Sequence, residues 1–562
     1  MSGPLEFDTI IVGAGSAGCL LANRLSAQRG QRILLVEAGG EDDWFWIKIP
    51  VGYLFTIANP RTDWCFKTQP EPGLAGRSVH YARGRGLGGS SSINAMIYMR
   101  GQSYDFDQWA QLTGDERWRW NGENGQTLSI YKALENYFGG ANDWHGETGE
   151  IRVETPRVKW KILDAWQQAA AQQGIPSIDE FNRGNNEGCA YFHVNQRRGR
   201  RWSMADAFLH PVRHRENLSV FTNTQTLQVL FEENRERRPS DQSAWANATL
   251  RARGVRLLKD GQIIEARARK EVILSAGAIG SPHILQASGI GDPKHLAEFY
   301  VPVRQDLPGV GQNLQDHLQI RTIFKIKNAR TVNSLYANPL SRIGMALQYG
   351  LLRRGPMTMP PSTLGAFTKS DPSQPSANLE WHVQPLSLPK FGEPLHEFDA
   401  ITPSVCNLRP SSRGQVLLQH SDPLQAPSIR CNYLSTPDDL DIAVKGIEAT
   451  RAIMKAEALA AYAPEELLPG PAKVSQQDLE QAARELGTTI FHPVGTCAMG
   501  RVNNEGESEN PFTVLDTSFR LRGVAGLRVV DASAMPTITS GNTNAPVMLM
   551  AERAARDILA SR

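Results

Sequence analysis

The chain has little that would tie it to the interior of a membrane or to nucleic acid. It contains no run of about eighteen consecutive apolar residues, the length that a membrane-spanning helix requires. Its 60 Lys and Arg residues nearly balance its 58 Asp and Glu residues, so the charge gives no reason to expect nucleic acid as a partner. Two local basic runs, at 197–201 and 251–256, are interpreted as solvated surface.

The sequence also offers little room for a targeting segment and no cysteine framework. A predicted strand begins within the first ten residues, so we expect no signal or transit peptide. The six cysteines lie far apart and form no CxxC pair, which favours reduced, mostly packed thiols. We therefore expect a cytoplasmic protein. Peripheral contact with the inner membrane is compatible with this expectation, and the pattern predicts no oligomeric state.

Several catalytic signatures are missing as well. There is no P-loop, no GxSxG motif and no Cys-His zinc spacing. His210 and His214 lie four residues apart, but Pro211 would interrupt a helix there and no carboxylate lies between them, as an HExxH site would need. We expect no metal centre. No internal repeat is present either, and 562 residues are too many for one core.

What the chain does have is a complete dinucleotide-binding unit near its start. Thr9–Val12 predicts a buried strand, Gly13 allows a tight turn, and Gly15 leaves room for a pyrophosphate. Gly18 lets the following helix, from residue 17 to about 28, pack closely on the sheet. A second strand is predicted at 32–36, and Glu37 follows it directly. A carboxylate at this position can accept hydrogen bonds from both hydroxyls of an adenosine ribose. Free N–H groups at the helix start suit the phosphates.

Further segments extend this unit. A segment rich in Trp and Pro follows at 39–72 and is predicted to be a long, ordered connection outside the regular alternation of strands and helices. Residues 83–96, RGRGLGGSSSINAM, favour a phosphate-facing turn over a flexible linker because two arginines flank the glycines. Residues 162–174 predict an amphipathic helix, 218–232 two strands and 270–276 another strand. Residues 277–291 predict a turn followed by an apolar helix, and glycines mark the end of that helix.

Between about 326 and 484 the proline content rises and the apolar pattern changes, which predicts an inserted domain. Prolines crowd in, and alternating stretches at 379–383 and 416–419 suit an antiparallel sheet. A helix begins after Thr436, with proline at its first position and acids in its first turn. After 485 the pattern of the first unit returns, with a buried strand predicted at 527–531 and a C-terminal helix at 545–559. The predicted division is 1–155, 205–325 and 485–562 for the nucleotide-binding domain, with 156–204 and 326–484 for the substrate domain.

Taken together, these segments resemble the glucose–methanol–choline (GMC) family of flavoprotein oxidoreductases nearly end to end. The resemblance is carried by VGAGSAG at 12–18, EAG at 37–39, the segment at 83–96, the segment at 277–291, GVGQNLQDH at 309–317, HPVGTCAMG at 492–500 and VVDASAMPTITSGNTNAPVMLMAERAA at 529–555. Within the family, segments such as YMRGQSYDFDQWA at 98–110 are most similar to bacterial choline and medium-chain alcohol dehydrogenases.

The resemblance implies FAD rather than NAD. It also implies an α/β fold, with a Rossmann-type FAD-binding domain and an inserted substrate domain built on an antiparallel sheet with helices. It assigns the cofactor site to Gly13, Gly15, Ser16, Ala17, Gly18, Glu37, Ala38, Arg83, Gly88, Gly89, Ser91, Asn94, Ala95, Val229, Asp531, Ala532 and Asn542. In this assignment Val229 lies at the adenine, and Asp531 and Ala532 close on the ribityl chain.

A histidine and an asparagine near the carboxyl end are the candidate catalytic pair. Oxidation of an alcohol needs a group that takes the hydroxyl proton, and imidazole suits this task near neutral pH. A side-chain amide can hold the substrate oxygen in line. The family carries a histidine at the start of its HPxGT-like motif and His or Asn downstream, which gives His492 and Asn542 here. Asn544 is the weaker match for the second position.

The position before Asn94 bears on how the flavin is held. Covalently flavinylated relatives carry histidine there, whereas this chain has Ile93, so the resemblance favours non-covalent FAD. We expect oxidation of an alcohol to its aldehyde, with electrons passed to a quinone, a dye or O2. The alcohol would be primary: aliphatic, benzylic, furanic or choline-like. Two alternatives stay open: a hydroxynitrile lyase or fatty acid photodecarboxylase on the same fold, and a flavin-binding protein without enzyme activity.

Overall fold

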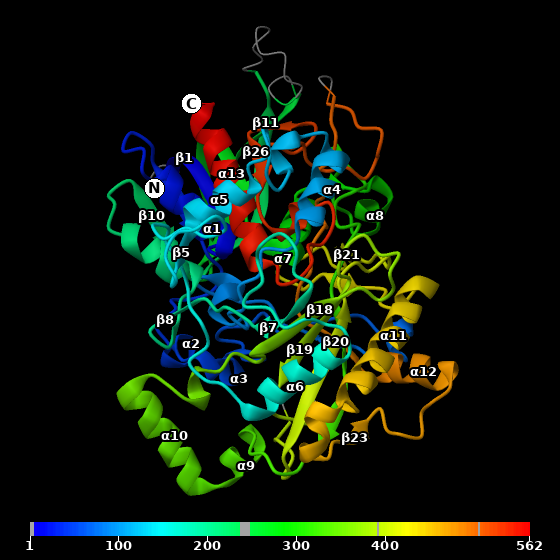
Figure 1. Ribbon diagram of the computed structural model, residues 1–562. Helices are drawn as coiled ribbons and strands as arrows, with labels where there is room; N and C mark the ends of the chain where they lie inside the picture. The colour runs from blue at the N-terminus through cyan, green and yellow to red at the C-terminus, as the bar shows by residue number, and fades with distance from the viewer. Residues whose placement is uncertain (1–4, 236–244, 246–247, 390–392, 504–505, 562) are drawn as a thin grey trace.

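A computed structural model describes residues 5–235, 245, 248–389, 393–503 and 506–561. Two large sheets organise this part of the chain, and each contains eight strands (Figure 1). Each sheet has its own apolar core of buried side chains, and a smaller core packs around Phe181 and Phe192. The architecture is the predicted mixture of α and β structure. No helix among the described residues is both long and apolar enough to cross a bilayer.

The first sheet contains the predicted dinucleotide-binding unit. Its strand order is β10-β2-β1-β13-β12-β11, with β26 beside β13 and β25 beside β12. The strands are β1 Leu5–Val12, β2 Ile33–Val36, β10 Leu218–Phe221, β11 Thr224–Glu233, β12 Leu250–Lys259, β13 Gln262–Leu274, β25 Val524–Ala525 and β26 Leu527–Val529. The strands β10, β2, β1 and β13 run parallel, and β12 and β11 extend the sheet antiparallel. Parallel strands are buried on both faces, which explains the continuous apolar runs at 9–12 and 33–36.

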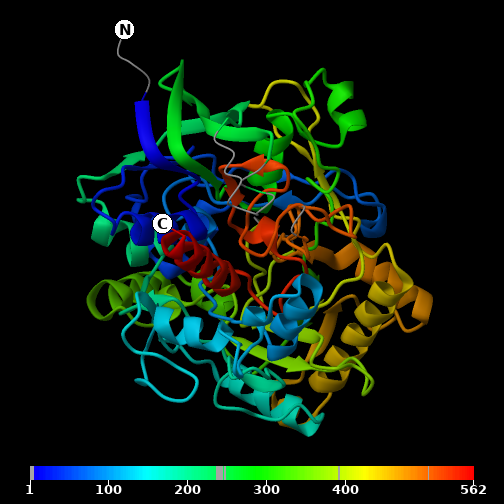
Figure 2. The same ribbon diagram turned by 90° about the horizontal axis from the view of Figure 1, so that it is seen from above.

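Three helices that begin at the ends of these strands cover the sheet near the site. They are α1 Ser16–Leu25, α7 Gly277–Ala287 and α13 Asn544–Ala560. The first and last helix of the chain pack against each other, and Figure 2 shows α13 beside the N-terminal segment. Residues that are more than 500 positions apart in the sequence therefore share one end of the first sheet.

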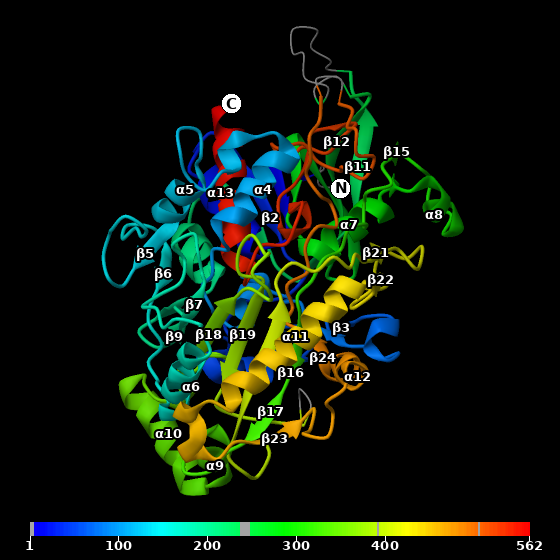
Figure 3. The ribbon, with the colours of Figure 1, turned by 45° about the vertical axis from the view of Figure 1, so that its right-hand side comes forward.

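The second sheet is antiparallel throughout its main path, as predicted for the inserted region. Its order is β23-β17-β20-β19-β18-β7, and β16 links β20 to β24. The strands are β7 Gly188–Tyr191, β16 Leu318–Arg321, β17 Ile323–Lys325, β18 Leu364–Thr368, β19 Leu379–Gln384, β20 Ala400–Asn407, β23 Glu465–Leu468 and β24 Gly487–Thr489. The helices α11 Pro437–Met454 and α6 Lys161–Gln172 pack on its outer face (Figure 3).

The remaining elements are short or peripheral. The other helices are α2 Phe45–Lys48, α3 Tyr53–Thr56, α4 Ser103–Thr113, α5 Thr127–Leu134, α8 Pro293–Glu298, α9 Val332–Ala337, α10 Pro339–Leu352 and α12 Gln476–Leu486. In the described part of the chain, five strand pairs lie outside the two large sheets: β3 Phe66–Lys67 with β4 His80–Tyr81, β5 Glu135–Tyr137 with β6 Ile151–Val153, β8 Gln196–Arg197 with β9 Arg200–Arg201, β14 Ile290–Gly291 with β15 Gln305–Asp306, and β21 Gln415–Leu417 with β22 Ser428–Arg430.

Sheet membership differs in detail from the predicted division of the chain. The prediction assigned β16, β17 and β24 to the nucleotide-binding domain, but all three strands belong to the second sheet. The reason is that β16 pairs with β20 on one side and with β24 on the other, so it carries the chain from one sheet into the other. The other predicted boundaries stay predictions. The predicted strand at 416–419 forms β21, which pairs with β22 outside the large sheet.

Candidate active site

A cavity of about 1430 Å³ lies between the two sheets. It is larger than the pockets of roughly 300–1,000 Å³ that hold one drug-sized ligand, so it offers room for a dinucleotide and a substrate together. Its wall comes from the turn after β1, the end of β2, the glycine-rich segment at 83–96, the start of α7, the inner face of the second sheet and the carboxyl-terminal motifs. Apart from the second sheet, these segments carry motifs on which the family resemblance rests.

The glycine turn after β1 is built for close approach. Gly13 has a φ of +98°, which a side chain would strain. A Cβ at Gly18 would lie 1.9 Å from the carbonyl oxygen of Gly13, so the helix packs as closely as predicted. A Cβ at Gly15 would meet no atom within 4 Å, because this position faces the cavity at the start of α1. The residues present therefore fit a pyrophosphate at the N-terminus of α1.

The buried carboxylate of Glu37 connects three segments of the site, a role that the sequence did not predict. Its carboxylate accepts backbone hydrogen bonds from Ala14 at 2.9 Å, from Gly39 at 2.8 Å and from Gly86 at 3.0 Å. It therefore joins the first glycine turn, the end of β2 and the second glycine-rich segment. A carboxylate offers about four acceptor sites, so a site for a ribose hydroxyl remains. Burial raises the pKa of Glu37, while the three amides and Arg85 act in the opposite direction.

Most of the predicted site residues line this one cavity. Those that do are Gly13, Gly15, Ser16, Ala17, Glu37, Ala38, Arg83, Gly89, Ser91, Asn94, Ala95, His492, Asp531, Ala532 and Asn542. Gly18 and Gly88 lie behind the wall and shape it. Val229 lies in the core instead, where its N–H donates to Ser288, and Leu227 lines the cavity in its place. The pairing of β11 is irregular between Thr226 and Gln228, which residue spacing could not reveal.

One basic residue supports the site wall from behind. Arg201 was interpreted as solvated surface together with its neighbours, but its side chain is buried. Its guanidinium donates to Ser91 O at 3.2 Å, to Asn94 Oδ1 at 2.8 Å and to Ile47 O at 3.0 Å. Burial lowers the pKa of Arg201 to about 9. Arg201 thus fixes the glycine-rich segment from behind, a role that the apparently exposed basic run concealed.

His492 and Asn542 meet at the wall of the cavity, where they form a hydrogen-bonded pair. Asn542 Nδ2 lies 3.0 Å from His492 Nε2, and His492 Nδ1 lies 3.0 Å from His317 Nδ1. Asn544 does not take part, because its amide oxygen accepts a hydrogen bond from Ser16 at 2.6 Å. His317 was not among the predicted site residues, although it ends the motif GVGQNLQDH at 309–317.

The hydrogen bonds fix which nitrogen of His492 carries the proton. His317 Nε2 lies 3.0 Å from the carbonyl oxygen of Leu408, so this nitrogen must donate. In neutral His317 the other nitrogen, Nδ1, is then an acceptor, and His492 Nδ1 must donate to it. The remaining nitrogen of His492, Nε2, carries a lone pair that the amide of Asn542 meets. His492 therefore presents a basic nitrogen on the cavity side.

The charge state agrees with this tautomer. Burial is the main cause that lowers the pKa of His492 well below 6.5, and positive charge at His317, His382 and Arg83 would act in the same direction. Burial also lowers the pKa of His317. Both rings are neutral at pH 7, so the lone pair at Nε2 is free of a proton.

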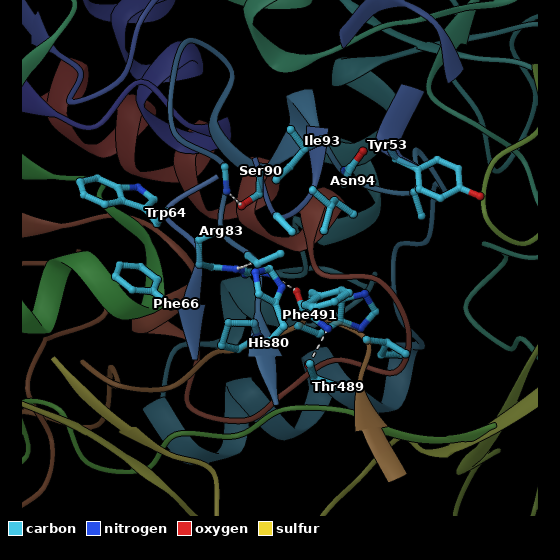
Figure 4. Close-up of a pocket in the computed structure, with 18 of the residues that line it drawn as sticks. Tyr53, Trp64, Phe66, His80, Arg83, Ser90, Ile93, Asn94, Thr489 and Phe491 are labelled. Atoms are coloured by element: carbon cyan, nitrogen blue, oxygen red, sulfur yellow. Dashed lines mark hydrogen bonds between the residues drawn. The ribbon is translucent and has the colours of Figure 1, made fainter. Parts of the chain in front are cut away.

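A buried carboxylate holds the backbone of this motif. Asp316 accepts hydrogen bonds from His492 N at 2.7 Å, from Thr489 Oγ1 at 2.6 Å, from Tyr81 OH at 3.0 Å and from Tyr433 OH. From the other side Arg83 donates to the carbonyl of Phe491, as Figure 4 shows. Asp316 and Arg83 together clamp the residues just before the imidazole of His492.

Two clusters of ligand-type side chains occur among the described residues, and protein atoms already occupy both. Asp42 and Asp206 both contact the ammonium group of Lys48, at 2.5 and 2.8 Å. His210 Nε2 lies 2.9 Å from a carboxylate oxygen of Asp42. Asp63, beside Cys65 and His80, accepts three backbone N–H groups, from residues 58, 65 and 83. Hydrogen bonding within the protein accounts for both arrangements.

Comparisons with known proteins agree with the site. Models of the GMC oxidoreductases match residues 7–319 and 410–551. The chain is 37% identical to "Alcohol dehydrogenase [acceptor]" of Pseudomonas putida, with 98% of this chain and 96% of that protein covered. It is 35% identical to an oxygen-dependent choline dehydrogenase of Chromohalobacter salexigens, with 98% and 94% covered. The crystal structure of pyridoxine 4-oxidase from Mesorbium loti superposes with a TM-score of 0.85 at 30% identity, with 99% of each chain covered.

A formate oxidase structure shares the fold, with a TM-score of 0.87 at 24% identity over 100% of this chain and 99% of that chain. The family match spans more than half of the sequence, and the relatives match over nearly their whole length. The predicted family, fold class and cofactor are confirmed. The chain belongs to the GMC oxidoreductases, a family of FAD-dependent enzymes.

Proposed function

We propose that the protein oxidises a primary alcohol to the aldehyde, with His492 as the general base. The observation that carries this proposal is the hydrogen-bond order from Leu408 through His317 to His492, which leaves a lone pair on Nε2 at the cavity wall. That nitrogen can accept the hydroxyl proton. When bound, FAD supplies the acceptor for the hydride that leaves the alcohol carbon.

Asn542 is proposed to orient the substrate oxygen. Its Nδ2 donates toward His492, and its Oδ1 has no hydrogen-bond partner in the described part of the chain. An alcohol that enters between the two side chains would give its proton to His492 and receive a hydrogen bond from the amide. Holding the hydroxyl in this geometry lowers the entropic part of the barrier. A quinone, a dye or O2 would then take the electrons, and the cytoplasm is the proposed compartment.

The cofactor contacts are proposed from the same cavity. The first glycine turn would hold the pyrophosphate, and Glu37 would use its remaining acceptor site for the ribose. Asp531 already accepts hydrogen bonds from Gly277 N at 2.9 Å and Ser281 Oγ at 2.5 Å, so it fixes the start of α7 beside the ribityl position. Non-covalent attachment is proposed because Ile93 lines the cavity where a histidine would be needed.

Flavin reduction in a single anaerobic turnover tests the role of His492. We expect His492→Ala to keep its FAD and to reduce it roughly 10²–10⁴-fold more slowly with a neutral primary alcohol. Because the pKa of His492 is lowered, the wild-type rate should be constant from neutral pH upward and fall only below the ordinary histidine range. Asn542→Ala should also be slow but keep this pH profile.

The same measurement separates the alternatives. A His492→Ala protein that matches the wild type in rate and pH profile would remove His492 from the mechanism. Flavin that stays oxidised with every alcohol, while a hydroxynitrile is cleaved or light releases CO2 from a fatty acid, would contradict the proposed oxidation itself.

A further inference from the structure

The cation Arg321 lines the cavity, and no carboxylate of the described residues forms an ion pair with it. Side chains alternate along a strand, so Gln319 and Arg321 lie on one face of β16, while Leu318 and Ile320 pack into the second core on the other. His317 directly precedes this strand. Gln319 and Arg321 line the cavity. At about 3.3 Å per residue, the backbone of Arg321 lies roughly 13 Å from that of His317, the ring that contacts His492.

The neighbours of Arg321 do not neutralise it. Among the described residues no carboxylate lies within 4.0 Å of its guanidinium and no side chain or carbonyl accepts a hydrogen bond from it. Across the sheet it is registered with Ser404, which pairs with His382, and neither offers a negative charge. The titratable groups that face it are Tyr53 of α3, whose side chain also lines the cavity, and His396, and neither carries a negative charge at neutral pH. A partly buried guanidinium stays charged and is costly without a partner.

We propose that Arg321 binds a carboxylate at the far end of the alcohol substrate, which makes the preferred substrate an ω-hydroxy acid. This inference rests on the proposed function, because it places the hydroxyl group at His492. Guanidinium binds carboxylate through two parallel hydrogen bonds. The apolar wall around Met359, Leu386 and Leu388 suits the methylene chain between the two groups. The same charge repels a quaternary ammonium substrate, so choline is a poor fit.

Competition between charged and neutral alcohols tests this subsite. Anaerobic flavin reduction would be measured with ω-hydroxy acids of increasing chain length, with their methyl esters and with choline. For one range of lengths, the wild type should bind the acid at least about tenfold more tightly than the ester. Arg321→Met should abolish this difference. The matched control Arg342→Met, which removes a charge at the cavity mouth, should keep it.

Equal affinity for acid and ester, or a preference that survives Arg321→Met, would overturn the subsite. Efficient reduction by choline would do so as well. If neither the esters nor any other alcohol reduced the flavin, the proposed function would fail instead, so the two failures can be told apart.

A second, independent observation concerns helix α10, which stands out from the body of the molecule (Figures 1 and 3). Its residues Leu340, Ile343, Leu347 and Leu351 follow at spacings of three and four, and 57–80% of each is exposed. This spacing places all four on one face of the helix. An exposed stripe of four large aliphatic side chains exceeds the scattered single residues of an ordinary surface.

The opposite face of α10 is already in use. Arg342 and Met345 line the cavity, and Tyr349 is buried. On a helix these three positions lie about 180° from the aliphatic stripe. The orientation of α10 is therefore fixed, with one face over the cavity and the aliphatic face turned outward.

The charge around α10 indicates what covers the aliphatic face. Residues 317–370 contain no Asp or Glu, while the exposed Arg330 and Arg354 precede and follow α9 and α10 in the sequence. A second copy of the same face would bring like charges together. An anionic lipid surface offers headgroups for the arginines and an apolar layer for the aliphatic stripe. We propose that α10 lies in the interface of an anionic bilayer, with the cavity mouth beside it.

Vesicle flotation tests this surface. The FAD-loaded wild type should float with phosphatidylcholine vesicles that contain phosphatidylglycerol and bind pure phosphatidylcholine far less. Leu347→Glu with Leu351→Glu should lower the partition coefficient at least about tenfold, since it removes two apolar contacts and adds negative charge. The control Val474→Glu changes an aliphatic residue that is equally exposed elsewhere and should leave binding intact.

Three results would overturn the proposal: no binding to anionic vesicles, binding that the double variant does not change, or a dimer in light scattering that the double variant dissociates. The last result would assign the aliphatic face to a second copy of the chain. Flavin reduction by a short soluble alcohol checks that the double variant is folded, because neither leucine lines the cavity.

Discussion

At the scale of single residues, the hydrogen bond with His317 determines which ring nitrogen of His492 is left without a proton, and so which one could serve the proposed proton transfer. Without an acceptor at His492 Nδ1, the ring is free to place its proton on Nε2, where it would block proton transfer. We expect His317→Phe to slow flavin reduction roughly 5- to 150-fold, which corresponds to about 1–3 kcal/mol for a lost buried partner. FAD content should stay the same, because His317 does not line the cavity.

A conservative variant separates this positioning role from simple packing. In His317→Gln the side-chain oxygen can accept from His492 Nδ1 and the amide can donate to Leu408, so most of the rate should return. If the glutamine variant is as slow as the phenylalanine variant, the tautomer argument is wrong and His317 serves only to fill space.

At the scale of elements, two glycines at the start of helix α1 have different roles. Gly18 allows the helix to pack closely on the turn after β1, and Gly15 forms part of the surface that faces the cavity. Gly18 lies against the Gly13 carbonyl, whereas Gly15 faces open space with a φ of −77° that any residue can adopt. The two positions therefore form a matched pair for testing where the cofactor lies.

We expect Gly15→Ala to fold normally and to lose FAD, because its methyl group would project toward the pyrophosphate. The free energy of unfolding of the flavin-free protein should change by no more than about 0.5 kcal/mol. Gly18→Ala should destabilise the flavin-free protein by about 3 kcal/mol or more, because the helix must move off the sheet. Denaturant unfolding and FAD titration of both variants measure this. Normal FAD affinity in Gly15→Ala would move the pyrophosphate away from α1.

At the scale of the whole molecule, the sequence predicted the parts of the site better than their assembly. The motifs around Gly13 and Glu37 follow from local rules of turn geometry and acceptor placement, whereas the choice of His492 depends on the family resemblance. The cavity contains all three residues. The role of His317 could not be predicted, because no spacing rule links residue 317 to residue 492. The burial of Arg201 was missed for a similar reason, since it depends on a segment about a hundred residues away.

The way in which the flavin is retained is also a property of the whole molecule. The cavity is lined by segments from both sheets and from both ends of the chain, so the flavin should be held by contacts on many sides and by hydrogen bonds. Ile93 offers no nucleophile for a covalent bond. Bound FAD should therefore raise the free energy of unfolding, by about 2.7 kcal/mol at a hundredfold excess over Kd. Unfolding should release it completely.

Acid precipitation measures this directly. After denaturation of the yellow protein in acid and centrifugation, we expect a colourless pellet and all of the flavin in the supernatant as intact FAD. Colour in the pellet would mean a covalent bond to another side chain of the cavity wall. His80 would be the first to examine, because it lines the cavity and neither of its ring nitrogens has a hydrogen-bond partner among the described residues. In that case His80→Ala should return the flavin to the supernatant.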